Sequence, residues 1–163
     1  MNSLSHINPN GRPAMVDVSS KAVSNRSAHA RCQMQLPPAT MATFNGTDFD
    51  NAKGAVINTA IIAGTLAAKN TAQLIPLCHP LPLEDCQIAI EVHPDGRLDI
   101  DCRVKTSART GVEMEAITGA NLAAICLYDM LKATSPAIEI RSCYLVSKTG
   151  GKRDYQREAV HAE

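Results

Sequence analysis

The sequence predicts an α+β domain of the ferredoxin-like kind, in which the order β-α-β-β-α-β gives an antiparallel sheet with both helices on one face. Two observations predict this order. Apolar and polar residues alternate with the period of two that marks half-buried strands at 27–36, 86–92 and 98–105. Two longer segments are predicted as helices, 50–70 by apolar residues at helical spacing and 111–132 by a capping signature at its start.

The first strand follows a segment without a regular pattern. Residues 1–26 include the turn-forming run Asn-Pro-Asn-Gly-Arg-Pro at 8–13 and are expected to be irregular. From 27 to 36 apolar residues alternate with polar ones, and the two prolines that follow end the strand. A short helix is expected at 39–44.

The two long helices carry recognisable end signals. The helix at 50–70 is rich in Ala and Gly, which implies close packing against a sheet or another helix, and Asn70 is placed to cap its C-terminus. The helix at 111–132 starts after Thr110, and Glu113 stands three residues later in the spacing of a capping box.

The remaining elements complete a single domain over 1–163. A Pro-Asp-Gly turn at 94–96 joins two strands into a hairpin, and a last strand is expected at 137–146. A loop at 147–152 and a mobile tail from Asp154 onward follow. The outward positions of the sheet are polar and can face water or a partner subunit: His29, Arg31, Gln33, Asp99, Asp101 and Arg103.

Composition bounds the function. Basic and acidic residues number 16 each among 163, which argues against a general polyanion binder. Only 3% of residues are aromatic, so a sheet that stacks RNA bases is not expected, and no nucleic-acid partner is predicted. The six cysteines form no C-x-x-C pair and indicate reduced thiols in a cytoplasmic protein. No signal peptide, membrane-spanning segment or membrane partner is predicted.

Residues 74–83, Leu-Ile-Pro-Leu-Cys-His-Pro-Leu-Pro-Leu, form the most informative local segment, which we call the proline ribbon. Its three prolines restrict φ and remove backbone donors, so neither a helix nor a central strand is expected. The ribbon carries one thiol, Cys78, and one imidazole, His79. It suits a stiff wall that positions a ligand, although by shape alone a proline-rich turn packed on the core is the simpler interpretation.

Other common site chemistries find little support in the spacing. The five histidines never stand at H-x-x-x-H spacing, so no metal site is predicted. A covalent role for Cys78 requires a base that the sequence does not identify. The loop at 147–152 has glycines and lysines without the spacing of a Walker A motif, so it is either a solvated loop or a flexible basic loop around an anionic ligand.

The predicted helix at 111–132 carries charged residues at both ends. Glu115 and Asp129 are 14 positions apart, which places them about 40° apart on one stripe but about 21 Å apart along the axis. One small ligand cannot touch both within a single chain. Either the ends serve different sites, or one site lies between subunits and takes its two ends from two chains. The plain alternative is that these charges only cap the helix or favour its dipole.

Four long motifs carry a family resemblance: the ribbon at 74–81, Thr-Gly-Val-Glu-Met-Glu-Ala at 110–116, Tyr-Asp-Met at 128–130 and Lys-Thr-Gly-Gly-Lys at 148–152. With the segments at 5–8 and 15–21, they make the chain similar to the cyclic pyranopterin monophosphate synthase family, the MoaC-type enzymes of molybdenum cofactor biosynthesis. The resemblance covers about residues 4 to 158.

The resemblance implies a lyase. Such an enzyme converts (8S)-3′,8-cyclo-7,8-dihydroguanosine 5′-triphosphate, a cyclo-dihydro-GTP made from GTP by an upstream radical enzyme, to cyclic pyranopterin monophosphate and releases pyrophosphate. The resemblance also implies a homohexamer built as a trimer of dimers, with the site between subunits. No cofactor is required by the sequence; Mg²⁺ can accompany the substrate triphosphate, but no motif demands it.

The resemblance also assigns residues to the site. Asp129 matches the active-site position, and Lys53 and Lys132 match the essential lysines. The matched substrate contacts are Leu77, Cys78, His79, Glu113, Met114 and Glu115. Positions near the site are matched by Asp17, Lys21, Lys148 and Lys152.

These residue types suit the implied chemistry. Rebuilding a purine into a pterin requires repeated proton transfers, which Asp129 with Lys53 and Lys132 can supply, and a lysine near other cations has a lowered pKa. Lys21, Lys148 and Lys152 can stabilise the charge on departing pyrophosphate. Two other functions stay open: a ligand-sensing module that binds effectors between subunits, and a structural partner that assists a separate radical enzyme.

Overall fold

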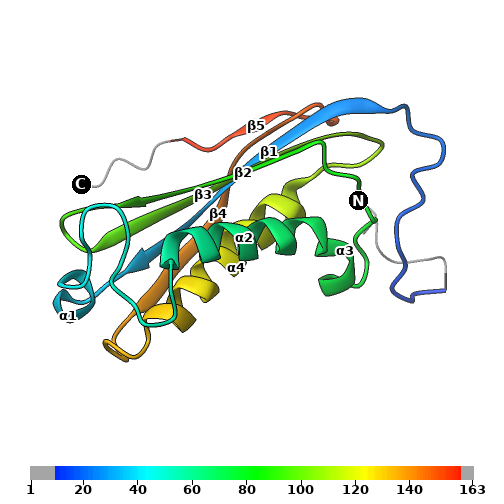
Figure 1. The fold of residues 1–163 in the computed structure, drawn as a ribbon. Helices are drawn as coiled ribbons and strands as arrows, with labels where there is room; N and C mark the ends of the chain where they lie inside the picture. Colours follow the sequence, from blue (N-terminus) through cyan, green and yellow to red (C-terminus); the bar gives the residue numbers. More distant parts are fainter. Residues whose placement is uncertain (1–9, 159–163) are drawn as a thin grey trace.

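The computed structural model describes residues 10–158 and confirms the predicted α+β fold with its order β-α-β-β-α-β (Figure 1). The elements are β1 Ser24–Gln35, α1 Pro38–Met41, α2 Val56–Lys69, α3 Thr71–Leu74, β2 Asp85–Val92, β3 Arg97–Ala108, α4 Glu113–Leu131, β4 Glu139–Thr149 and β5 Tyr155–Gln156.

The sheet is antiparallel and has the strand order β2-β3-β1-β4-β5. β1 pairs with β3 from Ser24↔Ala108 to Gln35↔Arg97, so strands far apart in the sequence are neighbours in the sheet. The long helices α2 and α4 lie together on one face, with the short helices α1 and α3 toward opposite ends of that layer (Figure 1). Within the described residues, no helix has both the length and the apolar character needed to span a membrane.

The core lies between the sheet and these two helices. The inward residues of β1, from Ala28 to Met34, are almost fully buried, as the period-two alternation predicted. Small residues let α2 and α4 approach closely, because a Cβ added to Gly64 would lie 2.6 Å from the carbonyl oxygen of Gly119. All six cysteines are free thiols.

The predicted helix starts need correction. α2 begins at Val56 and not near residue 50, because the carboxylate of Asp48 accepts the backbone N–H groups of Val56 and Ile57 and thereby caps the helix from the preceding loop. The predicted capping box of α4 is wrong: Val112 is the N-cap residue and makes no side-chain cap hydrogen bond. The carboxylate of Glu113 instead accepts a hydrogen bond from Lys148 on β4. The predicted C-cap of α2, Asn70, is confirmed.

The C-terminal region is more ordered than the sequence predicted. β4 continues to Thr149, so half of the predicted loop at 147–152 is strand, paired on one side with β1. β5, which falls in the tail predicted to be mobile, pairs with β4 at Lys148↔Tyr155. The two strands form a short hairpin, but β5 has only two residues, too few for an alternating pattern to reveal it. The predicted irregular start is confirmed for 10–23, but β1 begins at Ser24, so the last three residues of the segment predicted to be irregular, 24–26, belong to the strand. The strand is longer at this end because it keeps pairing with β3 from Ser24↔Ala108. The ends of the chain, 1–9 and 159–163, lie outside the described range.

The sheet face opposite the helices is polar, as predicted, but its acids are not solvated. Asp101 accepts two hydrogen bonds from Arg31, at 3.0 and 2.8 Å, and lies 2.5 Å from Nε2 of His29. Asp99 accepts a hydrogen bond of 2.8 Å from Gln33. Both carboxylates are therefore buried, because the side chains that bind them also cover them from water.

Replacing Gly64 with Ala tests the close approach of α2 and α4. Ala ordinarily stabilises a helix by about 1 kcal/mol relative to Gly. Here the new Cβ would meet Cδ1 of Ile88 at 2.5 Å and the backbone oxygen of Gly119 at 2.6 Å. The isoleucine can move, but the buried backbone cannot. We expect the free energy of unfolding to fall by roughly 1–3 kcal/mol in chemical denaturation.

Asn58→Ala on the exposed side of the same helix is the matched control and should be neutral or slightly stabilising. A Gly64→Ala protein as stable as the wild type would contradict the close packing of the two helices.

Candidate active site

The structure divides the predicted site residues between the two ends of α4. Asp129 and its lysines lie at the C-terminal end, whereas the proline ribbon lies beside Glu113 and Glu115 at the N-terminal end. The helix is continuous from Glu113 to Leu131. About 21 Å of helix therefore separates Glu115 from Asp129, as the sequence spacing predicted.

The C-terminal group is an exposed ion-paired cluster. Nζ of Lys132 lies 2.7 Å from Oδ1 of Asp129, and Nζ of Lys53 lies 3.4 Å from Oδ2. Lys53 also donates to the backbone oxygen of Asp129 at 3.1 Å. About half of each side chain is exposed. With two ammonium groups around one carboxylate, the cluster suits an anionic substrate.

The pKa values of this cluster move in opposite directions. Hydrogen bonds from Lys132 and then from Lys53 lower the pKa of the Asp129 carboxyl. The hydrogen bond to Asp129 raises the pKa of Lys132, which is opposite to the lowering that the sequence argument expected for a site lysine. The physical reason is that Lys132 faces an anion and water, with no desolvating wall around it.

The N-terminal group forms a pocket of about 310 Å³. All six predicted substrate contacts line it: Leu77, Cys78, His79, Glu113, Met114 and Glu115. Leu81, Thr110 and Gly111 complete the lining. These three were not chosen from the sequence, although each lies inside one of the motifs that carry the resemblance. The signal that could have found Thr110 and Gly111 was their position directly before the acidic start of α4.

Apart from Leu74, which ends α3, the proline ribbon is irregular, as its prolines predicted, and it is held from two sides. The hydroxyl of Thr106 on β3 donates to the carbonyl of Pro82 at 2.6 Å. Nε2 of His79 lies 2.7 Å from the carbonyl oxygen of Val16, which can only accept, so Nε2 carries the proton. Nδ1 is then the ring nitrogen of His79 that remains for a ligand. The ribbon is thus packed on the rest of the fold and also lines the pocket.

Two acids at the start of α4 have different environments. Glu113 accepts a hydrogen bond of 2.7 Å from Nζ of Lys148. Glu115 is 4% exposed and has no cation within ion-pair distance among the described residues. Burial raises its pKa from 4.5 to about 7, and the charge of Glu113 adds to the effect. Burial, and then Glu115, also raise the pKa of the Cys78 thiol, which argues against a reactive thiolate there.

Glu115 also lines a second pocket, of about 300 Å³, together with Leu81. Lys69 and Gln73 contribute to this second lining. Glu115 and Leu81 are therefore shared by the linings of the two pockets.

The other three predicted residues lie apart from the pocket lining. Asp17 follows Val16, the partner of His79, and its carboxylate accepts the backbone N–H of Ser19 at 2.8 Å. Lys21 and Lys152 are exposed, and neither forms an ion pair within residues 10–158. Within one chain the structure does not bring these three residues into contact with the acids of either end.

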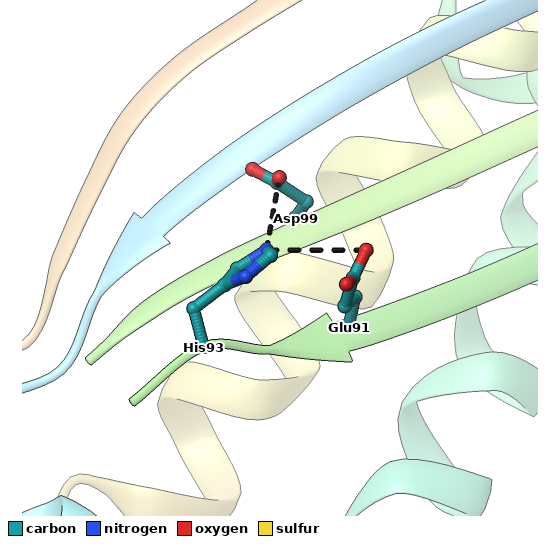
Figure 2. A group of neighbouring side chains, drawn as sticks. All are labelled: Glu91, His93 and Asp99. Atoms are coloured by element: carbon teal, nitrogen blue, oxygen red, sulfur yellow. Dashed lines mark hydrogen bonds and ion pairs between the residues drawn. The ribbon is translucent and has the colours of Figure 1, made fainter. Parts of the chain in front are cut away.

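Outside the site, one group of side chains has the composition of a metal-binding cluster (Figure 2). Nε2 of His93 lies 3.1 Å from Oδ2 of Asp99 and 3.9 Å from Oε2 of Glu91. The same Asp99 oxygen lies 3.5 Å from Nη1 of Arg97 and 3.8 Å from Nη1 of Arg31. Two guanidinium groups beside the central carboxylate oppose a cation. We interpret the group as part of the ion-pair network on the sheet.

Glu115→Gln tests the buried carboxyl through the pH dependence of stability. Because the pKa is raised in the folded protein, folded Glu115 binds more protons than unfolded Glu115 between pH 4.5 and about 7. Wild-type stability is therefore lost as pH rises through this window, and the Gln variant lacks this loss. We expect the stability of the variant relative to wild type to increase by roughly 3 kcal/mol across the window, measured by urea denaturation. A difference that stays constant with pH would contradict the raised pKa.

Comparisons with known proteins find relatives that match most of the chain. Residues 15–151 match the model of the MoaC family. A cyclic pyranopterin monophosphate synthase from Xanthomonas axonopodis pv. citri is 50% identical over 151 residues, which cover 93% of this chain and 92% of that protein. One of the same name from Nostoc sp. is 49% identical, with coverages of 92% and 89%. A molybdenum cofactor biosynthesis bifunctional protein from Synechocystis sp. is 43% identical over 96% of this chain and 46% of its own length. The chain belongs to the MoaC family.

Proposed function

We propose that this chain is an enzyme of molybdenum cofactor biosynthesis, a cyclic pyranopterin monophosphate synthase. As a lyase it converts the cyclo-dihydro-GTP intermediate to cyclic pyranopterin monophosphate and releases pyrophosphate. The observation that carries the proposal is the near full-length match to relatives with this name. The clustering of six motif residues around one pocket supports it independently.

The N-terminal pocket is the proposed site for the ring system of the substrate. Its volume of about 310 Å³ is at the lower end of the range for small-molecule sites. Glu113, Glu115 and Nδ1 of His79 offer acceptors, which suit the N–H groups on the edge of a guanine-derived ring. The stiff ribbon holds Leu77 and Cys78 as the apolar wall of this pocket.

The C-terminal cluster is the proposed catalytic centre for proton transfer. Asp129 with Lys53 and Lys132 exchanges protons with the opening and closing rings. Lys21, Lys148 and Lys152 stabilise the phosphates while pyrophosphate leaves, and Mg²⁺ can accompany the triphosphate as part of the substrate.

One substrate can meet both groups only if they come from two subunits. The proposed assembly is a homohexamer built as a trimer of dimers in the cytoplasm, with each site between subunits. Exposed apolar side chains on the helix layer support association, because Ile62, Leu66 and Ile125 are each at least half exposed in one chain. The upstream radical enzyme that supplies the substrate is the proposed pathway partner.

Lys53→Ala and Lys132→Ala test the catalytic assignment. Each variant should lose product formation because the proton-transfer group is gone, while the oligomer remains intact since both side chains are half exposed. The measurement is pyrophosphate release from the purified cyclo-dihydro-GTP intermediate, with size-exclusion chromatography for the assembly. Lys105→Ala, an exposed lysine on β3, is the matched control and should retain wild-type turnover.

Full turnover by either variant would contradict the lysine roles. A wild-type protein that binds the intermediate without converting it would favour a sensing module. Conversion only in the presence of the radical enzyme would favour a structural partner.

A further inference from the structure

Asn51 bridges two parts of the site that no local pattern connects. It lies in the segment 50–55 that leads into α2, which we call the lysine loop because it carries Lys53. The side-chain Nδ2 of Asn51 donates to the carbonyl of Met130, 2.5 Å away at the end of α4. Its Oδ1 accepts the backbone N–H of Lys53 at 2.8 Å. Both ends of one amide are thus used.

We propose that Asn51 is a positioning residue, whose amide fastens the lysine loop to the C-terminal end of α4 and so sets the ammonium group of Lys53 on Asp129. This inference rests on the proposed function, in which Lys53 is catalytic. It adds a residue that has no hydrogen bond to Asp129 among the described residues, does not line the pocket, and acts through the backbone of Lys53 and Met130.

The end of α4 explains why this contact forms. The last carbonyls of a helix have no partner within the helix and require donors from elsewhere. Asn51 supplies a donor to the carbonyl of Met130, and Nζ of Lys53 supplies one to the carbonyl of Asp129 at 3.1 Å. The lysine loop therefore acts as the cap of α4. The ammonium group of Lys53 thus lies at the helix end because the carbonyl of Asp129 there requires a donor.

The ion pair alone is too weak to hold the loop. Lys53 and Asp129 are about half exposed and 3.4 Å apart, and exposed pairs of this kind contribute little to ordering a flexible side chain. The Asn51 amide fixes the backbone instead. The carbonyl of Asn51 also accepts the N–H of Gly54 at 3.1 Å, and Gly54 has φ +103°, which closes the turn directly after the lysine.

A second tether separates this role from general stability. Asp48 holds the other end of the segment by capping Val56 and Ile57 at the start of α2. Removing the Asn51 amide therefore leaves α2 capped and the core unchanged, and it releases only the part of the loop that carries Lys53. The predicted defect is in catalysis more than in folding.

The test compares Asn51→Ala and Asn51→Asp with Asn58→Ala. Asp keeps an acceptor for the N–H of Lys53 but loses the donor to Met130, so both Asn51 variants should be impaired. We expect kcat to fall roughly 10- to 100-fold, as for a misplaced catalytic group, with KM changed by less than about twofold. Asn58 is exposed on α2 and has no side-chain hydrogen bond among the described residues, so its variant should match the wild type.

A second readout does not depend on turnover. The lysines are reductively methylated with ¹³C, and the Lys53 resonance is assigned by its loss in Lys53→Arg. In Asn51→Ala this resonance should move toward its position in Asp129→Ala, while in Asn58→Ala it should stay at the wild-type position. Wild-type kcat and an unmoved Lys53 resonance in Asn51→Ala would overturn the inference.

The two proposals fail in different ways. If the wild type does not convert the intermediate, the proposed function fails and the Lys53 resonance alone decides the role of Asn51. If the wild type is active, a defect in KM and thermal stability with an unmoved Lys53 resonance would show a merely structural asparagine and overturn the positioning role.

Discussion

Helix α4 has a fixed length and packs one face against α2 and the sheet, and the two functional groups of the proposed site are placed at its two ends. Its inner face is built from small residues, which bring it close to α2 and to the sheet. A rod packed in this way cannot shorten or bend to bring Glu115 to Asp129. The separation of about 21 Å is therefore a property of the fold, and it makes a site shared between subunits the simplest way to combine the two ends.

The two ends differ in chemistry because they differ in burial. At the C-terminal end, Asp129 is exposed and surrounded by ammonium groups, so it stays charged. At the N-terminal end, Glu115 is buried and without a cation among the described residues, so its pKa approaches neutrality. Together they would supply one substrate with an ion-paired acid and its lysines for proton transfer at one end of α4, and with a ring-binding pocket at the other end, whose buried carboxyl gains and loses a proton near pH 7. Neither end alone offers both the lysine cluster and the pocket.

Local patterns predicted the strands and the two long helices because alternation and helical spacing report directly on which side chains are buried. They failed where a contact outside the element decides the outcome. The carboxylate of Asp48 in the preceding loop sets the start of α2, Lys148 of β4 binds the Glu113 carboxylate that the predicted capping box required, and the two-residue strand β5 pairs with the end of β4. The site followed the same rule: contiguous motifs predicted the pocket, whereas the contact between Asn51 and Met130 joins residues 79 positions apart and left no local signal.

The most direct test of a site shared between subunits mixes two defective proteins. His79→Ala damages only the N-terminal group and Lys53→Ala only the C-terminal group, so each alone should be inactive. If the two ends of α4 meet across a two-fold pair of subunits, a mixed pair contains one site built from intact halves of both chains. Random mixing should then restore about one quarter of wild-type pyrophosphate release. Mixed oligomers with no more activity than their parents would contradict a site shared between subunits.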